Sequence, residues 1–295
     1  MRLRILNAWL RYAVRPVLGR ARSPERQARA FDRIGPRLFR GPPFICHLTE
    51  RAGDLRLHWI SVGRTDPRRV ILYLHGGAFI VGSGVAYRGL LGRIAKLTGL
   101  RVCAPDYRLL QDTPFPAAFD DAVRAWDALL AKGYRPSDIV LGGDSAGGGL
   151  MLALLVRLCA RGTRPAACFA MSPWTDMTLC GDSLRSREEV LLPVGRMPEL
   201  VERYLQGAAV DDPRASPIFA RFCEPPSVLI QVGGGEALLD DARRMADVLG
   251  DAALLRVWDD VPHVWQMFDG YIPEARAALR EIADFVHTSF VMASR

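Results

Sequence analysis

Short apolar runs alternate along this chain with longer amphipathic stretches, and this alternation restricts the choice of fold more than any other feature of the sequence. Several of the runs are apolar throughout, which is typical of strands in a parallel sheet that helices cover on both faces. The pattern therefore predicts an α/β fold with a central, mostly parallel sheet flanked by helices. The predicted strands are residues 55–60, 70–74, 100–104, 139–141, 166–171, 228–232 and 254–257. The predicted helices are residues 87–97, 117–131, 146–159, 236–249 and 273–286.

Two segments interrupt the alternation. Residues 1–45 are predicted to form one or two arginine-rich helices, and residues 183–210 an irregular, partly helical insertion between successive strands. An insertion on the loop side of an α/β sheet lies over the place where ligands bind. We therefore expect both segments to form a helical cap. The expected organisation is a cap segment at residues 1–50, a first part of the core at 51–182, a cap insertion at 183–212 and a second part of the core at 213–295.

Positive charge is concentrated near the start of the chain. Residues 1–40 contain eleven arginines and two acids, a net +9, so the rest of the chain sums to −2 of the total +7. A basic groove for nucleic acid is therefore not expected. An apolar stripe at helical spacing in the same segment fits either a cap helix packed on the domain, which we favour, or a helix lying on a membrane surface. The stripe consists of Leu3, Leu6, Leu10, Val14 and Val17.

Six cysteines are scattered along the chain without a Cys-x-x-Cys pair. This spacing predicts neither a zinc site nor a disulfide framework, and it favours a reducing cytoplasm. Charged residues interrupt each apolar stretch near the N-terminus before the core of a signal peptide can form. We therefore expect no bound metal and a cytoplasmic location.

The strongest local motif is Gly143-Asp144-Ser145-Ala146-Gly147, between a predicted strand and a predicted helix. Gly-x-Ser-x-Gly at such a turn is the nucleophile elbow, in which the glycines allow a tight backbone that exposes the serine hydroxyl. The start of the following helix also favours negative charge beside the serine. Ser145 is therefore the predicted nucleophile, and Asp144 is a predicted supporting residue.

A second motif, His75-Gly76-Gly77-Ala78, follows a predicted strand about 70 residues before the serine. Consecutive glycines let backbone N–H groups approach the oxygen that becomes negative during acyl transfer. We predict that the N–H groups of Gly76, Gly77 and Ala146 form an oxyanion hole. His75 is expected to hold the loop by hydrogen bonding rather than to act as a base.

Five histidines are candidates for the general base. His47 and His58 precede most of the predicted sheet, and a packing role is expected for His287 in the last predicted helix. His263 follows the last predicted strand, in a loop that can bring its imidazole over Ser145. His263 is therefore the predicted base.

The acid of such a site is expected between Ser145 and His263 in chain order, in a loop after a strand. Glu236 follows the predicted strand 228–232 at the turn itself, and Asp240 lies about one helical turn further on. Acids at a helix start also stabilise the helix through its dipole. We favour Glu236 and keep Asp240 as the main alternative.

Together these motifs resemble those of the hormone-sensitive-lipase-like (family IV) esterases of the α/β-hydrolase superfamily. The resemblance implies an eight-stranded α/β-hydrolase fold, an N-terminal helical cap, an acyl-enzyme mechanism and no cofactor. Glu236 departs from the aspartate that is usual at the acid position, and residues 110–112, Leu-Gln-Asp, depart from the usual Ala-Pro-Glu. The matching segments are residues 75–78, 106–109, 114–118, 143–148 and 172–174.

The predicted function is that of a serine carboxylesterase acting on short-chain or cyclic carboxylic esters through an acyl-Ser145 intermediate. A lactone or amide hydrolase using the same residues is the alternative. A non-catalytic small-molecule receptor is disfavoured because serine, base and acid candidates are all present. The expected partner is a small ester and not a nucleic acid. The sequence leaves open the acyl chain length, the alcohol, the natural substrate and whether the chain forms a homodimer.

Overall fold

The computed structural model describes residues 2–20, 23–186 and 188–292. Residues 1, 21–22 and 187, which belong to the two predicted cap segments, lie outside the described residues. A central sheet organises the described part of the chain, with eight strands in the order β1-β2-β4-β3-β5-β6-β7-β8. Strand β2 is antiparallel to both β1 and β4, whereas the remaining neighbours are parallel. The predicted eight-stranded, mostly parallel sheet is confirmed. The strands are β1 (Ile45–Ala52), β2 (Leu55–Val62), β3 (Asp66–Leu74), β4 (Leu100–Pro105), β5 (Ile139–Asp144), β6 (Ala167–Met171), β7 (Val228–Gly233) and β8 (Ala253–Trp258).

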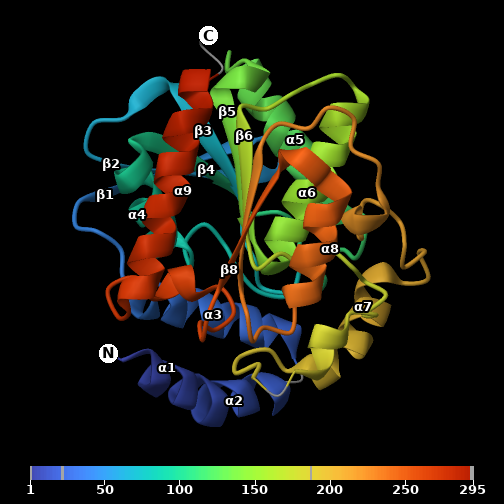
Figure 1. Ribbon diagram of the computed structural model, residues 1–295. Helices are drawn as coiled ribbons and strands as arrows, with labels where there is room; N and C mark the ends of the chain where they lie inside the picture. The colour runs from blue at the N-terminus through green and yellow to red at the C-terminus, as the bar shows by residue number, and fades with distance from the viewer. Residues whose placement is uncertain (1, 21–22, 187, 293–295) are drawn as a thin grey trace.

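Helices cover both faces of this sheet (Figure 1). Helices α4 (Arg88–Thr98) and α9 (Pro273–Met292) pack on one face. Helices α5 (Ala117–Ala131), α6 (Ser145–Ala160) and α8 (Leu239–Leu249) pack on the other. All five correspond to predicted helices. The largest difference is at α9, which ends six residues later than predicted. Helix α8 begins three residues later than predicted, so that Glu236 lies in the loop before the helix.

Strand β3 contributes side chains to the hydrophobic cores on both faces of the sheet. Val70, Leu72 and Leu74 belong to the core shared with α5, α6 and α8, whereas Ile71 and Tyr73 belong to the core shared with α4 and α9. All five side chains are fully buried. Successive side chains of a strand point to opposite faces, so a strand covered on both sides must be apolar at every position.

The sequence analysis did not predict strand β1, because it assigned residues 1–45 to helices and the next residues to no element. The strand is antiparallel to β2 at the edge of the sheet, and none of its residues is fully buried. An edge strand in contact with solvent can carry charged residues. The uniformly apolar pattern that revealed the inner strands is therefore missing from β1.

The N-terminal segment forms helices α1 (Leu3–Trp9), α2 (Arg15–Arg20) and α3 (Pro24–Leu38), and a π-helical turn joins the first two. Leu6 and Leu10 are buried in an apolar cluster with Val190 and Trp265, as expected for a cap helix. Val17, however, is 65% exposed. The π-helical turn accommodates an additional residue per turn and rotates the following helix, which takes Val17 out of the stripe. Within the described residues, no helix combines the length and apolar character that crossing a bilayer requires.

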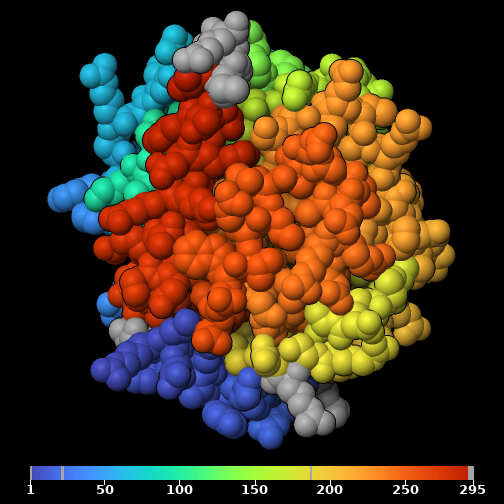
Figure 2. All heavy atoms as spheres, in the orientation of Figure 1, coloured from blue at the N-terminus to red at the C-terminus, as the bar shows by residue number. Residues whose placement is uncertain are grey.

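The second predicted cap segment lies beside the first. It contains helix α7 (Met197–Leu205) and short 3₁₀ turns, and Figure 2 shows it in yellow next to the blue N-terminal helices along one edge of the molecule. The guanidinium groups of Arg11 and Arg15 donate hydrogen bonds to the backbone carbonyls of Glu188 and Glu189 at 3.1 and 2.9 Å. The two segments therefore meet next to the loops that follow β7 and β8.

Candidate active site

Ser145 lies at the junction of β5 and α6, where its backbone φ is +50°. This conformation is uncommon for a residue with a side chain and is typical of functional turns. The neighbouring glycines make the turn possible. A Cβ on Gly147 would overlap the carbonyl oxygens of Leu74 and His75, and a Cβ on Gly143 would lie 2.9 Å from that of Leu74. The chain thus forms the predicted elbow, because only glycine allows α6 to begin this close to the end of β3.

A continuous line of hydrogen bonds joins Ser145 to two residues from distant loops. The Oγ of Ser145 lies 2.9 Å from Nε2 of His263, and Nδ1 of His263 lies 2.7 Å from Oε2 of Glu236. Glu236 follows β7 and His263 follows β8, so both loops lie at the carboxyl edge of the parallel strands, as does the elbow after β5. All three residues are less than a tenth exposed. The order of hydroxyl, imidazole and carboxylate is that of a serine hydrolase triad.

The surroundings of His263 favour its protonated form. Burial lowers the pKa of the imidazole, but the charge of Glu236 and its hydrogen bond to the ring outweigh burial and hold that pKa above the usual value. Glu189 and Asp144 contribute further negative charge. A base with a raised pKa accepts a proton from a hydroxyl more readily.

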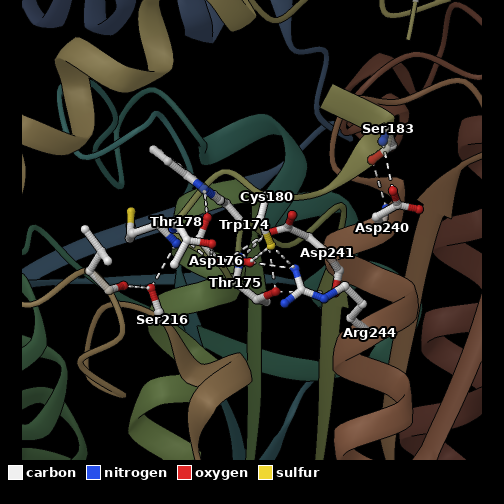
Figure 3. Close-up of polar contacts among 12 residues, drawn as sticks. Trp174, Thr175, Asp176, Thr178, Cys180, Ser183, Ser216, Asp240, Asp241 and Arg244 are labelled. Atoms are coloured by element: carbon white, nitrogen blue, oxygen red, sulfur yellow. Dashed lines mark hydrogen bonds and ion pairs between the residues drawn. The ribbon is translucent and has the colours of Figure 1, made fainter. Parts of the chain in front are cut away.

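Asp240, the alternative acid, is engaged elsewhere. Its Oδ2 accepts the backbone N–H of Ser183 at 2.8 Å, and its own N–H donates to Oγ of Ser183 at 3.0 Å. Figure 3 shows this pair apart from the other labelled contacts. Asp240 therefore joins α8 to the cap insertion, whereas the carboxylate beside His263 is that of Glu236.

Figure 3 also shows how the start of α8 is anchored to the segment after β6. The Oδ2 atom of Asp241 accepts the N–H groups of Thr175 at 2.7 Å and Asp176 at 3.0 Å. Arg244, one turn further along α8, donates to Oδ2 of Asp176 at 2.6 Å. Burial raises the pKa of Asp241 to about 7. These contacts hold the beginning of the helix next to the Glu236 loop.

The prediction that Gly76 supplies an oxyanion-hole N–H is wrong. This N–H donates to Oδ1 of Asp144 at 2.9 Å and therefore already has an acceptor. The next two N–H groups of the same loop, on Gly77 and Ala78, have no hydrogen-bond acceptor among the residues that the structure describes. Ala146 lies in the first turn of α6, where backbone N–H groups have no partner within the helix. The available donors are thus Gly77, Ala78 and Ala146.

Asp144 connects the elbow to the glycine loop. Besides the N–H of Gly76, its carboxylate accepts the hydroxyls of Tyr73 at 2.8 Å and Tyr87 at 2.9 Å. Burial raises its pKa to about 6, although the hydrogen bonds from the two tyrosines and Gly76 act in the opposite direction. The sequence indicated a supporting role for Asp144. It did not indicate the tyrosines, which come from β3 and from the residue before α4.

His75 occupies the loop position expected for it. Its Nδ1 lies 2.8 Å from the carbonyl oxygen of Gly76, its ring stacks on Tyr107 at 4.3 Å between centroids, and burial lowers its pKa. The remaining histidines lie away from Ser145. His47 and His58 contact one another across β1 and β2, and Nε2 of His287 lies 2.9 Å from the carbonyl oxygen of Thr98. Among the described residues, no group of His, Cys, Asp and Glu side chains could hold a metal ion.

Ser172 is a site residue that sequence reasoning missed, apart from its place in a family motif. Its hydroxyl donates to Oε1 of Glu236 at 2.7 Å and accepts the N–H of Val264 at 3.2 Å. The same Oε1 accepts the N–H of Gly233 at 2.7 Å. One buried hydroxyl therefore fixes both the acid and the backbone next to His263.

Known proteins share both the sequence and the architecture of this chain. Residues 71–267 match the model of a family described as having the alpha/beta hydrolase fold. An acetyl-hydrolase of Streptomyces hygroscopicus is 37% identical over 243 residues, which cover 80% of this chain and 81% of the relative. An esterase of Acinetobacter venetianus is 36% identical over 224 residues, which cover 74% of each chain.

Solved structures extend the similarity to almost the whole of the given chain. A crystal structure of an esterase from the bacterial hormone-sensitive lipase family has a TM-score of 0.90 and 36% identity, with 98% of both chains covered. The crystal structure of a protein named EstE5, soaked with p-nitrophenyl butyrate, has a TM-score of 0.91 and 33% identity, again with 98% of both chains covered. The chain therefore belongs to the alpha/beta hydrolase fold family and, within it, to the hormone-sensitive-lipase-like esterases, as its motifs predicted.

Proposed function

We propose that this protein is a serine carboxylesterase that hydrolyses short-chain or cyclic carboxylic esters through an acyl-Ser145 intermediate. The observation that carries the proposal is the line of contacts of 2.9 and 2.7 Å from Ser145 through His263 to Glu236. The names of its relatives, esterase and acetyl-hydrolase, support an ester with a small acyl group as the substrate class.

In the first half of the proposed reaction, Nε2 of His263 takes the proton of the Ser145 hydroxyl as Oγ attacks the ester carbonyl. The tetrahedral intermediate collapses when the carbon–oxygen bond to the alcohol breaks, and His263 gives its proton to that alcohol. In the second half, His263 takes a proton from water as the water attacks the acyl-serine carbonyl. The bond between the acyl carbon and Oγ then breaks, His263 returns its proton to Oγ of Ser145, and the carboxylic acid leaves. Glu236 orients the ring and stabilises its charged form throughout. The reaction converts one ester and one water into a carboxylic acid and an alcohol, and the proposed steps require no cofactor.

The proposed oxyanion hole consists of the N–H groups of Gly77, Ala78 and Ala146. Backbone donors held in place before the reaction lower the energy of the tetrahedral intermediate without having to reorganise. Asp144 supports this arrangement because it precedes Ser145 in the elbow and its carboxylate accepts the N–H of Gly76 in the glycine loop. This hydrogen bond fixes the position of the glycine loop relative to Ser145.

The proposal is tested with Ser145→Ala and p-nitrophenyl butyrate. We expect loss of the nucleophile to lower kcat by about 10⁵-fold or more, because the acyl-enzyme no longer forms. The thermal midpoint should stay close to that of the original protein, which separates loss of chemistry from loss of fold. Undiminished turnover by the folded variant would refute the serine mechanism. Turnover of a matched ester, lactone and amide by the original protein then ranks the substrate classes.

A further inference from the structure

The cap insertion holds the loop that carries Glu236 through several hydrogen bonds. The hydroxyl of Ser183 donates to the carbonyl oxygen of Ala237 at 2.7 Å, in addition to its two contacts with Asp240 (Figure 3). The hydroxyl of Ser186 donates to the carbonyl oxygen of Gly235 at 3.3 Å. Residues on both sides of Glu236 are therefore fastened to the insertion.

Glu189 provides the charged contact between the same two segments. Its side chain is 2% exposed, and Oε2 accepts the N–H of Ala237, the residue directly after Glu236, at 2.9 Å. Its Oε1 accepts the N–H groups of Leu191 and Leu192 at 2.6 and 2.9 Å. A buried carboxylate is stable only when hydrogen-bond donors surround it. The backbone of the insertion and that of the acid loop supply these donors jointly.

The acid loop borders an open space on the side of α1. A cavity of about 1000 Å³ lies between α1 and the loops, and its lining includes Glu189, Glu236 and His263. Where side chains do not fill the space beside a loop, packing does not restrict its position. On this side the hydrogen bonds from the insertion restrain the backbone of the acid loop, in addition to the contacts of the Glu236 carboxylate with Ser172 and Gly233. Glu189 also carries one of the negative charges that act on His263.

The N-terminal helices also form hydrogen bonds to the insertion and to the loop of His263. Arg15 of α2 donates to the backbone carbonyl of Glu189 at 2.9 Å. Asn7 of α1 donates to the carbonyl oxygen of Asp260, in the loop of His263, at 2.7 Å. Both halves of the cap are thus linked to the part of the site that supplies the acid and the base.

We propose that Glu189 is a positioning residue for the triad: it fastens the loop of Glu236 to the cap insertion, so that the acid meets His263 only while the insertion is docked. This inference rests on the proposed esterase function. The hydrogen bonds to Leu191 and Leu192 would suffice for a local turn. The bond to Ala237 has no local purpose and connects the cap to the acid.

The test compares Glu189→Gln with Glu188→Gln, in p-nitrophenyl butyrate hydrolysis across a range of pH. The amide that replaces the Glu189 carboxylate can accept on one side only and turns a second donor toward an N–H group. We expect kcat to fall at least about tenfold with little change in KM, because the acid is misplaced rather than the substrate. The loss of kcat at low pH, which forms the acidic limb of the pH–rate profile, should move to lower pH, because a charge that raises the pKa of His263 is removed. The exposed neighbour Glu188 should be replaceable without either effect.

A merely structural Glu189 would lower the thermal midpoint and leave kcat and the acidic limb of the folded enzyme as they were, and that result overturns the proposal. If Glu189→Gln does not fold, Ser183→Ala removes two contacts between the same segments and should change kcat and the acidic limb in the same directions. An unaltered Ser183→Ala enzyme would then count against the proposal. The proposed esterase function is tested separately. If the original protein is inactive, or if Ser145→Ala is as active as the original protein, the esterase function is refuted. If the original protein is active and Glu189→Gln keeps its kcat, only the role of Glu189 is refuted.

Discussion

The two oxygens of the Glu236 carboxylate have different partners. Oε2 faces His263, whereas Oε1 accepts hydrogen bonds from Ser172 and from the N–H of Gly233, three residues earlier. The side chain therefore folds back over its own loop and is held at three points. A glutamate is long enough to make this turn and still reach the imidazole, which explains how the chain accommodates a glutamate where its family usually has an aspartate.

Glu236→Gln is predicted to lower kcat by about 10³- to 10⁴-fold, because an amide can stabilise the wrong tautomer of His263 and does not stabilise its charged form. The original enzyme should lose activity as the pH falls through a pKa above 6.5, since only the neutral imidazole accepts a proton. Removal of the Glu236 charge should lower the pKa of His263 and so move this loss of activity to lower pH. Rate measurements between pH 5 and 9 check both expectations.

Asp240→Asn is the matched control for this prediction. Asp240 bonds to Ser183 and not to His263, so the variant should keep an acidic limb like that of the original enzyme and most of its kcat. A loss of activity in Asp240→Asn as large as in Glu236→Gln would contradict the assignment of the acid.

At the scale of single residues, the sequence was informative where a role depends on local motifs. Ser145 was predicted from its glycines, and His263 from its place after the last strand; the structure brings both together with Glu236. Ser172 and Glu189 were not found as site residues, because their contacts join segments that are about 50 to 90 residues apart. Gly76 was misassigned because the sequence does not show that Asp144 already binds its N–H.

Among the elements, the contact between β3 and α6 leaves no room for a side chain at Gly147. Gly147 brings the first turn of the helix against the backbone carbonyls of Leu74 and His75. Both the nucleophile and the glycine loop depend on this contact, because they begin at the two chain segments that meet there. Glycine is required here for close approach and not for a left-handed backbone.

Gly147→Ala is predicted to destabilise the protein by about 3 kcal/mol, because the added methyl group forces α6 away from β3. Gly195→Ala is the control, since a Cβ at this exposed glycine meets no atom within 4 Å. The control should change stability by less than about 1 kcal/mol. Thermal or urea unfolding of the two variants decides the matter, and equal stabilities would contradict the packing argument.

The sequence predicted the inner elements well and the outer ones less well, for physical reasons. An inner strand such as β6 is buried at every position, which leaves a continuous apolar run. Strand β1 is half exposed and lacks that signal. In the N-terminal segment four residues of the predicted stripe pack in one apolar cluster, namely Leu3, Leu6, Leu10 and Val14, whereas Val17 is exposed.

At the scale of the whole molecule, positive charge is concentrated in the predicted N-terminal cap segment. Most of the arginines of residues 1–40 lie in described helices at one edge of the molecule next to the insertion (Figure 2). Buried leucines and side-chain hydrogen bonds, rather than this charge, hold α1 on the domain. The arginines then make the cap a segment that trypsin cleaves readily whenever the helices detach.

Leu6→Asp is predicted to increase the rate of tryptic cleavage within residues 2–40 at least about tenfold, because loss of a fully buried apolar side chain weakens docking of α1. Ile5→Asp, at a neighbouring position that is 58% exposed, should change the rate little. Mass spectrometry of the fragments over time provides the measurement. Equal cleavage rates for the two variants would show that the leucine does not hold the helix.

The order of the site along the chain has a consequence for biosynthesis. The elbow, Asp144 and the glycine loop are complete once α6 has emerged from the ribosome, whereas His263 follows Ser145 by 118 residues. Until β8 has paired with β7, the nascent polypeptide presents a serine without its base. On the proposed mechanism, translation thus yields an inert hydroxyl first, and esters are attacked only after His263 has been synthesised and β8 has paired with β7.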